Sequence, residues 1–261
     1  MLRDVRRLLR QYRWPLAAVS AAGAVAAAFF LTLPSVGRLR TLNPSDTALT
    51  ERRAREAAER GRAARHTQHW MPLSRISPWL QRAVVNSEDA RFFQHDGVDL
   101  IETEEALSKA VDDGKLGRGA STITQQLAKN LWLGEERTLW RKLREAILAG
   151  RLEDLGKPRI LELYLNLAEW GDGIYGAEAA ARIWFRKPAL LLSPEESAVL
   201  AAMLPAPRKR NPLRPSAKLR KRAFEVLELY GKYGQIPPEE LADARERLAD
   251  LLGSGPLAAS R

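Results

Sequence analysis

The sequence of 261 residues contains no cysteine and only three histidines. Without cysteine the chain can form neither a disulfide nor a thiolate metal site. His66, His69 and His95 do not have the spacing of metal ligands. Acidic residues are also fewer than basic ones: the chain has 32 Asp and Glu against 42 Lys and Arg, which gives a net charge of +10. This excess predicts an acidic partner: nucleic acid, anionic lipid or a diphosphate substrate.

Charge is absent from one segment near the N-terminus, residues 14–33. An apolar run of about 20 residues matches the hydrocarbon thickness of a bilayer, so we predict a transmembrane helix. Arginines are more frequent in residues 1–13 than directly after the run, which places the N-terminus in the cytoplasm and the remainder outside the cytoplasmic membrane. Nucleic acid is then the least suitable partner. The alternative is a cleaved signal peptide, but its small-residue site at Ala24 to Ala26 would fall inside the apolar run.

Composition divides the chain into a cytoplasmic tail (1–13), a transmembrane helix (14–33), a stalk (34–69) and a folded domain (70–261). The stalk is expected because residues 51–65 are rich in Arg, Glu and Ala, as in a solvated helix. Beyond it, helical segments are separated by Gly and Pro, and little strict alternation of apolar residues argues for a sheet. We therefore predict an all-α domain.

The acidic pair Glu88-Asp89 follows a helix start signal at Ser77, an N-cap candidate before proline. At 100° per residue, Glu88 shares an arc with Val84 and Phe92, so its carboxylate lies among core-facing side chains. Desolvation there would raise its pKa and make it a general base or acid. The alternative is a buried glutamate tied to an arginine. Asp89 points about a quarter turn away and is expected to cap or pair locally.

Three other polar residues have structural interpretations on the pattern alone. His95 is expected near the end of the same helix, where a histidine usually bonds the last carbonyl groups. Tyr164 and Asn166 lie near the end of a helix that begins at Lys157, and such residues usually serve packing and capping. The basic residues within 208–222 are most simply interpreted as a solvated or membrane-facing surface.

A glycine-rich loop leads into a second helix start. Its glycines are Gly114, Gly117 and Gly119. Thr122 and Gln125 then have the spacing of a capping box, so helix N–H groups face the loop and could bind an anion. Arg118 precedes this start, and Ser121 and Lys129 lie on one side of the helix with Gln125. The alternative is an ordinary well-capped helix.

A second acid, Glu145, follows the basic pair Arg141-Lys142 on a predicted helix. The core side of this helix is expected to contain Leu139, Leu143 and Ile147. Glu145 would then lie on the opposite side, either in an exposed pair with Arg141 or along a cleft. In a cleft, the cations would grip a diphosphate while Glu145 organises them or holds a divalent ion.

Taken in chain order, these residues form a series of spaced motifs. The series is Glu88-Asp89 with Phe92, His95 and Gly97; Gly119 with Ser121 to Gln126, Lys129 and Asn130; Arg141-Lys142 with Glu145; and Lys157 with Ile160, Leu161, Tyr164 and Asn166. In this series the chain resembles the peptidoglycan glycosyltransferases of family 51, in particular the monofunctional, membrane-anchored biosynthetic transglycosylases. The resemblance covers roughly residues 70–230, and agreement at so many spaced positions is far more specific than any one motif.

The resemblance implies an all-α, lysozyme-like domain with a smaller membrane-associated lobe, which polymerises lipid II into glycan strands. By this likeness Glu88 and Glu145 are the catalytic residues. Glu88 would deprotonate the acceptor 4-hydroxyl, and undecaprenyl diphosphate would leave with inversion. The implied substrate-binding residues are Asp89, Phe92, His95, Arg118, Gly119, Ser121, Thr122, Gln125, Gln126, Lys129, Asn130, Arg141, Lys142, Tyr164 and Asn166.

The same likeness implies the surroundings of the enzyme. Its partners would be lipid II, the growing strand, membrane lipids and other cell-wall synthases, with no nucleic acid. Mg2+ or Mn2+ at Glu145 is the candidate cofactor, and no organic cofactor is expected. The location would be the bacterial inner membrane, with the catalytic domain outside the cytoplasm.

Bifunctional relatives carry an acylating domain with Ser-x-x-Lys and Lys-Thr-Gly, and neither motif occurs in this sequence. We therefore predict polymerisation without cross-linking. Two alternatives stay open on the sequence. One is a lysozyme-like lytic muramidase, which also uses a lone glutamate as acid. The other is a non-catalytic anchored scaffold for the cell wall.

Overall fold

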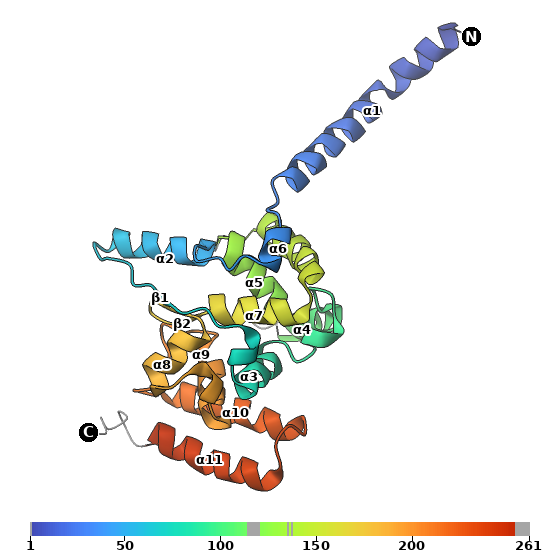
Figure 1. The fold of residues 1–261 in the computed structure, drawn as a ribbon. Coiled ribbons are helices and arrows are strands. Elements are labelled where there is room, and N and C mark those ends of the chain that lie inside the picture. Colours follow the sequence, from blue (N-terminus) through green and yellow to red (C-terminus); the bar gives the residue numbers. More distant parts are fainter. Residues whose placement is uncertain (1, 114–120, 135, 137, 254–261) are drawn as a thin grey trace. The chain divides into compact units, whose positions relative to one another are not determined.

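The computed structural model describes residues 2–113, 121–134, 136 and 138–253 (Figure 1). The chain separates into two compact units, Met1–Ser35 and Val36–Arg261.

The first unit consists mainly of one helix, α1 (Leu2–Leu31). Its segment Tyr12–Leu31 has a mean hydropathy of 1.8 and buries none of its residues against protein. Among the described residues it is the one helix long and apolar enough to cross a membrane. This agrees with the predicted span at 14–33 and fits a single-pass anchor.

The second unit is almost entirely helical, which confirms the predicted fold class. Its helices are α2 (Ala48–Glu59), α3 (Pro78–Glu88), α4 (Leu100–Asp113), α5 (Ile123–Trp132), α6 (Leu139–Leu152), α7 (Lys157–Leu167), α8 (Ala177–Phe185), α9 (Pro194–Met203), α10 (Ala217–Lys232) and α11 (Pro238–Gly253). Three short strands form a small sheet in the order β1-β3-β2: β1 (Thr67–Gln68), β2 (Glu169–Gly171) and β3 (Ile174–Tyr175). β1 pairs with β3 in parallel, and β2 pairs with β3 antiparallel.

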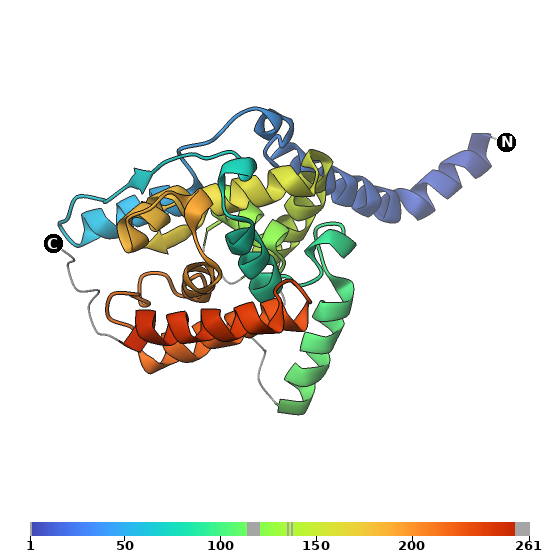
Figure 2. The ribbon, with the colours of Figure 1, turned by 60° about the horizontal axis from the view of Figure 1, so that its bottom comes forward.

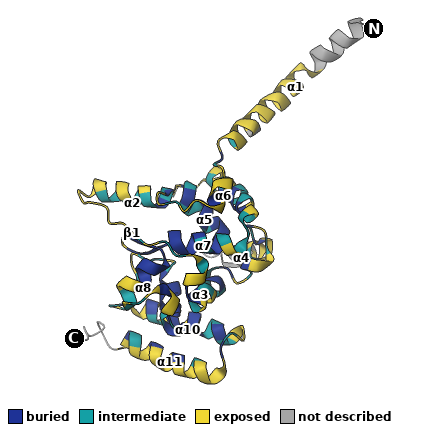
Figure 3. Cartoon of the chain, in the orientation of Figure 1, coloured by how far each residue is buried: buried dark blue, intermediate teal, exposed yellow. Residues whose placement is uncertain are grey.

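Two groups of helices bury the apolar side chains of this unit. Helix α9 packs against α3, α10 and α11, and nearly all of its residues are buried. Helix α5 packs against α6, α7 and α2. Figure 3 shows the buried colour concentrated on α5 and α7, whereas the outer side of α11 is exposed. Helix α3 lies beside α10 and α9, and Glu88 at its C-terminal end accepts a hydrogen bond from Gln126 of α5, so this end contacts both groups.

Most of the segment predicted as a stalk, 34–69, belongs to the second unit instead, which begins at Val36. Leu49 is buried where α2 packs on α5. Arg53 of α2 forms an ion pair with Glu169 of β2, with a nitrogen–oxygen distance of 2.8 Å. Gln68 of β1 donates a hydrogen bond of 2.8 Å to the backbone carbonyl of Asn166. The Arg/Glu-rich composition indicated a fully solvated helix. A helix rich in arginine can nevertheless be solvated on one face while an arginine on its other face pairs with a buried acid.

Candidate active site

Glu88 is the last residue of α3, and the helix places it as the sequence predicted. Ser77 caps the helix start by accepting a hydrogen bond of 3.3 Å from the Trp79 N–H. Val84 and Val85 on the same helix are buried. Glu88 itself is partly exposed, as a group that exchanges protons with a substrate must be.

Burial is the largest influence on the Glu88 carboxylate, and it raises the pKa above its ordinary value of 4.5. Opposing this rise are a hydrogen bond from Gln126 and the positive charges of Arg222, Arg210 and Lys129. The direct contact that defines the Glu88 carboxylate is the hydrogen bond from the neutral amide of Gln126, while three cations, not one arginine alone, act on it electrostatically. The carboxylate is therefore desolvated and able to take up a proton.

Gln126 connects Glu88 to the turn at Ser121. Its Nε2 donates to Glu88 Oε2 at 3.1 Å and to the Ser121 carbonyl at 3.3 Å. Its Oε1 accepts from the Tyr164 hydroxyl at 2.9 Å. Burial, together with the charges of Glu88 and Asp89, raises the pKa of Tyr164 well above its ordinary value. Tyr164 thus stays protonated and holds the amide with its N–H groups toward Glu88.

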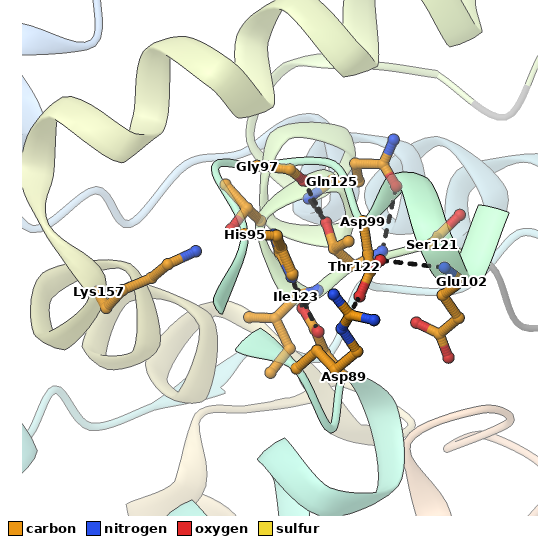
Figure 4. A network of polar contacts seen from close by, with 12 residues as sticks. Asp89, His95, Gly97, Asp99, Glu102, Ser121, Thr122, Ile123, Gln125 and Lys157 are labelled. Atoms are coloured by element: carbon orange, nitrogen blue, oxygen red, sulfur yellow. Dashed lines mark hydrogen bonds and ion pairs between the residues drawn. The ribbon is translucent and has the colours of Figure 1, made fainter. Parts of the chain in front are cut away.

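Asp89 is buried and connects the end of α3 to the start of α5 and to His95 (Figure 4). Its Oδ2 accepts from the N–H of Ile123, the first residue of α5, at 2.9 Å. His95 Nε2 lies 3.0 Å from Asp89 Oδ1 and 3.1 Å from Oδ2. This corrects two expectations: the helix ends at Glu88, well before His95, and His95 bonds a carboxylate rather than the last carbonyls.

The capping box at the start of α5 is confirmed. Thr122 Oγ1 accepts from the Gln125 N–H, and Gln125 Oε1 accepts from the Thr122 N–H, both at 3.1 Å. With Ile123 bonded to Asp89, these N–H groups already have protein acceptors. Anion binding at this helix start stays a prediction, and with three of its N–H groups occupied a bound anion would depend on positive side chains nearby. Arg118 and Gly119 lie outside the described residues.

Gly97 fixes the position of the turn that carries His95. Its φ of +84° favours glycine, and an added Cβ would lie 2.8 Å from the backbone carbon of Ala149 on α6. Its carbonyl accepts a hydrogen bond of 2.6 Å from Thr122 Oγ1 (Figure 4). The turn therefore ties α5 and α6 together behind the site.

Glu145 is buried on α6 and is held by two cations. Arg141 Nη1 lies 2.5 Å from its Oε2, and Lys142 Nζ lies 2.5 Å from its Oε1. Lys142 Nζ also donates to Ser121 Oγ at 3.1 Å. The basic pair and the loop before α5, which are distant in sequence, thus meet at one place.

The predicted faces of α6 are reversed. Leu139 is 90% exposed and Leu143 is also exposed, whereas Glu145 is only 3% exposed. The residues that share the buried face with Glu145 are Leu148, Ala149 and Leu152. Apolar spacing failed because the buried face contains an acid whose charge is balanced by neighbouring cations.

The surroundings of Glu145 do not fit a divalent metal ion. Each carboxylate oxygen already accepts from a cation, and two adjacent positive charges repel a third. Within the described ranges, no group of three or more His, Asp or Glu gathers in a way that could hold a metal.

The remaining predicted substrate-binding residues differ in burial, and their contact with substrate stays a prediction. Phe92 is fully buried, with Lys157 Nζ 4.5 Å from its ring centre. The Asn166 side chain accepts from the Met71 N–H and donates to the Met71 carbonyl, each at 2.8 Å. Lys129 and Asn130 on α5 are partly exposed, as contacts to a substrate would be.

Two arginines near Glu88 were missed by sequence reasoning. Arg210 and Arg222 act electrostatically on Glu88, although both lie in the run predicted as surface. Arg222 Nη2 donates to the Ser87 carbonyl at 3.2 Å. The position of Arg222 in the sequence could have indicated its role, because it lies next to the buried stripe of α10 that contains Leu219 and Ala223.

Comparison with known proteins agrees with this geometry. A family model described as Transglycosylase matches residues 54–230. Three similar proteins are each named biosynthetic peptidoglycan transglycosylase. That of Nitrosomonas eutropha is 46% identical over 189 residues, covering 72% of this chain and 78% of that protein. That of Laribacter hongkongensis is 48% identical over 167 residues (64% and 73%), and that of Nitrosospira multiformis is 43% identical over 186 residues (71% and 81%). The chain therefore belongs to the transglycosylase family.

Proposed function

We propose that this transglycosylase polymerises lipid II into linear peptidoglycan strands and releases undecaprenyl diphosphate. One observation carries the proposal: a desolvated carboxylate, Glu88, is surrounded by cations from three separate elements. These are Lys129 of α5, Arg210 of the loop after α9, and Arg222 of α10. A base beside a cationic pocket suits glycosyl transfer from a diphosphate donor, and the names of the relatives support this substrate class.

Glu88 acts as the general base. It accepts the proton of the acceptor 4-hydroxyl as that oxygen forms a bond to the anomeric carbon of the donor from the opposite face. The bond between the anomeric carbon and the diphosphate oxygen breaks with its electron pair, so the configuration inverts. The raised pKa of Glu88 helps because a base with a very low pKa would accept a proton poorly.

The leaving diphosphate gains negative charge as this bond breaks, and fixed cations stabilise that charge. Lys129, Arg210 and Arg222 are close enough to act on Glu88. Arg141 and Lys142 are held by Glu145, and Lys142 reaches Ser121. Glu145 thus acts by positioning cations rather than by transferring a proton.

Helix α1 is proposed as a single-pass anchor in the bacterial inner membrane, with the N-terminus in the cytoplasm. Its apolar span of 20 residues and the arginines before it support this arrangement. A lipid-linked substrate shares that membrane. Contact with membrane lipids and with other cell-wall synthases belongs to the same proposal, as does the lack of transpeptidase activity.

Purified full-length protein in detergent micelles, supplied with labelled lipid II, provides the test. We expect polymeric glycan on gels together with release of undecaprenyl diphosphate, and no cross-linked product. Finished glycan strands are supplied in a parallel reaction. Cleavage of those strands without polymer growth from lipid II would instead identify a lytic muramidase and overturn the proposal.

A further inference from the structure

A cavity beside α3, close in the chain to the proposed catalytic base, takes no part in the chemistry described above. It has a volume of about 530 Å3 and is bounded by α3, α7, the turn after α3 and the connection from α10 to α11. This volume falls within the range of about 300–1,000 Å3 that holds small ligands. Figure 2 shows α3 beside α10, and the connection from α10 to α11 contributes Tyr233 and Gln235 to the cavity lining.

The cavity follows one stripe of α3 and lies close to Glu88 without including it. Arg82, Val85 and Asn86 line it at helical spacing. At 100° per residue, Glu88 lies about a third of a turn from the centre of this stripe, on the same final turn of the helix. A chain bound in the cavity could therefore continue toward the catalytic base.

Aromatic rings stand at the rim of the cavity. Phe93 is 64% exposed and Tyr233 is 42% exposed, and both line the hollow. A pyranose ring presents an apolar face of C–H groups and an edge of hydroxyl groups. The face packs on an aromatic ring, and this contact needs no charge on the ligand.

Planar polar groups line the wall between these rings. Asn86 Nδ2 donates to Gln235 Oε1 at 2.9 Å, and the reciprocal contact from Gln235 measures 3.4 Å. This pairing fixes both amides, and each keeps one further N–H and acceptor capacity for a ligand. Arg82, whose guanidinium lies 5.3 Å from the Trp79 ring centre, adds directional donors. Hydroxyl and acetamido groups match this set.

Charge distinguishes this cavity from the surroundings of Glu88. None of its lining residues, all of which are described, is acidic, and Arg82 is the single cation among them. It therefore offers neither a general base nor the cation cluster that a diphosphate requires. A largely neutral, polyhydroxylated ligand fits it better than a strongly charged one.

We propose that this cavity is an accessory carbohydrate subsite that binds N-acetylhexosamine units of the glycan strand away from the reacting bond. The identity of the glycan as the enzyme's own strand rests on the proposed function. By holding the strand between successive additions, the subsite lengthens the product without changing the chemical step.

The test uses the full chain in micelles and chitotetraose, the tetramer of N-acetylglucosamine, as the probe. Calorimetry is performed on wild type, Tyr233→Ala, Tyr233→Phe and Ile183→Ala. Ile183 is 41% exposed on α8 and does not line the cavity, so it matches Tyr233 in exposure. We expect Tyr233→Ala to weaken binding about tenfold, Tyr233→Phe to retain it because the ring remains, and Ile183→Ala to have no effect. Arg82→Ala should also weaken binding.

Strand length supplies a second readout. With labelled lipid II, Tyr233→Ala should give shorter strands at an unchanged initial rate of lipid II consumption. Wild-type affinity for chitotetraose in both Tyr233→Ala and Arg82→Ala would overturn the subsite, and so would Tyr233-dependent binding of a free acidic peptide instead of the sugar. If chitotetraose binding depends on Tyr233 but the protein makes no polymer from lipid II, the subsite is supported and only the proposed function is rejected.

Discussion

Glu88 and Glu145 are both shielded glutamates, but the partners of their carboxylate oxygens differ. Glu88 accepts a hydrogen bond from the neutral amide of Gln126, and Arg222, Arg210 and Lys129 act on it electrostatically. Glu145 has a cation on each oxygen, Arg141 on one and Lys142 on the other. One carboxylate keeps acceptor capacity for a substrate proton, whereas the other is occupied.

The difference shows how one residue type serves two purposes. A carboxylate among apolar side chains and an amide binds a proton more readily, because its charged form is poorly solvated. A carboxylate between two cations serves as a fixed counter-ion that orders the cations around it. Proton transfer requires the first environment, and stabilisation of a leaving diphosphate benefits from the second.

Of the substitutions that test this difference, Glu88→Gln should have the largest effect on activity. The amide preserves shape but cannot accept the acceptor proton, so the initial rate of lipid II polymerisation should fall by about 10²–10⁴-fold. Glu246→Gln, at an exposed position of α11, is the control and should leave the rate unchanged. Retention of the cell-wall function in Glu88→Gln would favour a non-catalytic scaffold.

Glu145→Gln should have a smaller effect on the same rate. Arg141 and Lys142 would lose their shared counter-ion and hold less fixed positions, with an expected loss of about 10–100-fold. Glu228→Gln removes an exposed ion pair with Arg245 and serves as the matched control. A loss as large as that of Glu88→Gln, accompanied by a shifted acidic limb of the pH–rate profile, would mean that Glu145 itself transfers protons.

The smallest predicted effect concerns stability rather than rate. Because the folded-state pKa of Glu88 is raised, its contribution to stability is present below the unfolded value near 4.5 and is lost as pH rises through the folded value. Glu88→Gln should therefore have a higher Tm than wild type above that range, by about 2–4 °C for each kcal/mol of charge burial removed. Thermal melts at pH 4 and pH 7.5 measure the difference.

The difference in Tm between Glu88→Gln and wild type should shrink at pH 4, where both side chains are neutral. Glu246→Gln again provides the control, since its position is exposed. A wild-type Tm advantage at pH 7.5 would contradict a desolvated Glu88.

Local sequence signals predicted much of the fold and part of the site. The N-cap at Ser77 and the capping box at Thr122 depend on residues three positions apart or fewer, and both are confirmed. The placement of Glu88 followed from helical spacing. The reversal of α6 and the packing of the segment 34–69 were not predictable this way, because both depend on partners remote in sequence, such as Ser121 for Lys142 and Glu169 for Arg53.

The sequence by itself determined the helical class, the apolar N-terminal span, the helix starts and the position of Glu88 on a core-facing arc. These properties depend on residue type and spacing within a few turns of chain. Only the tertiary structure decided that Asp89 caps α5, that Arg210 and Arg222 approach Glu88, and that Glu145 is buried between cations. Electrostatic environment depends on distance in space, and packing brings together charges that the chain separates by many residues.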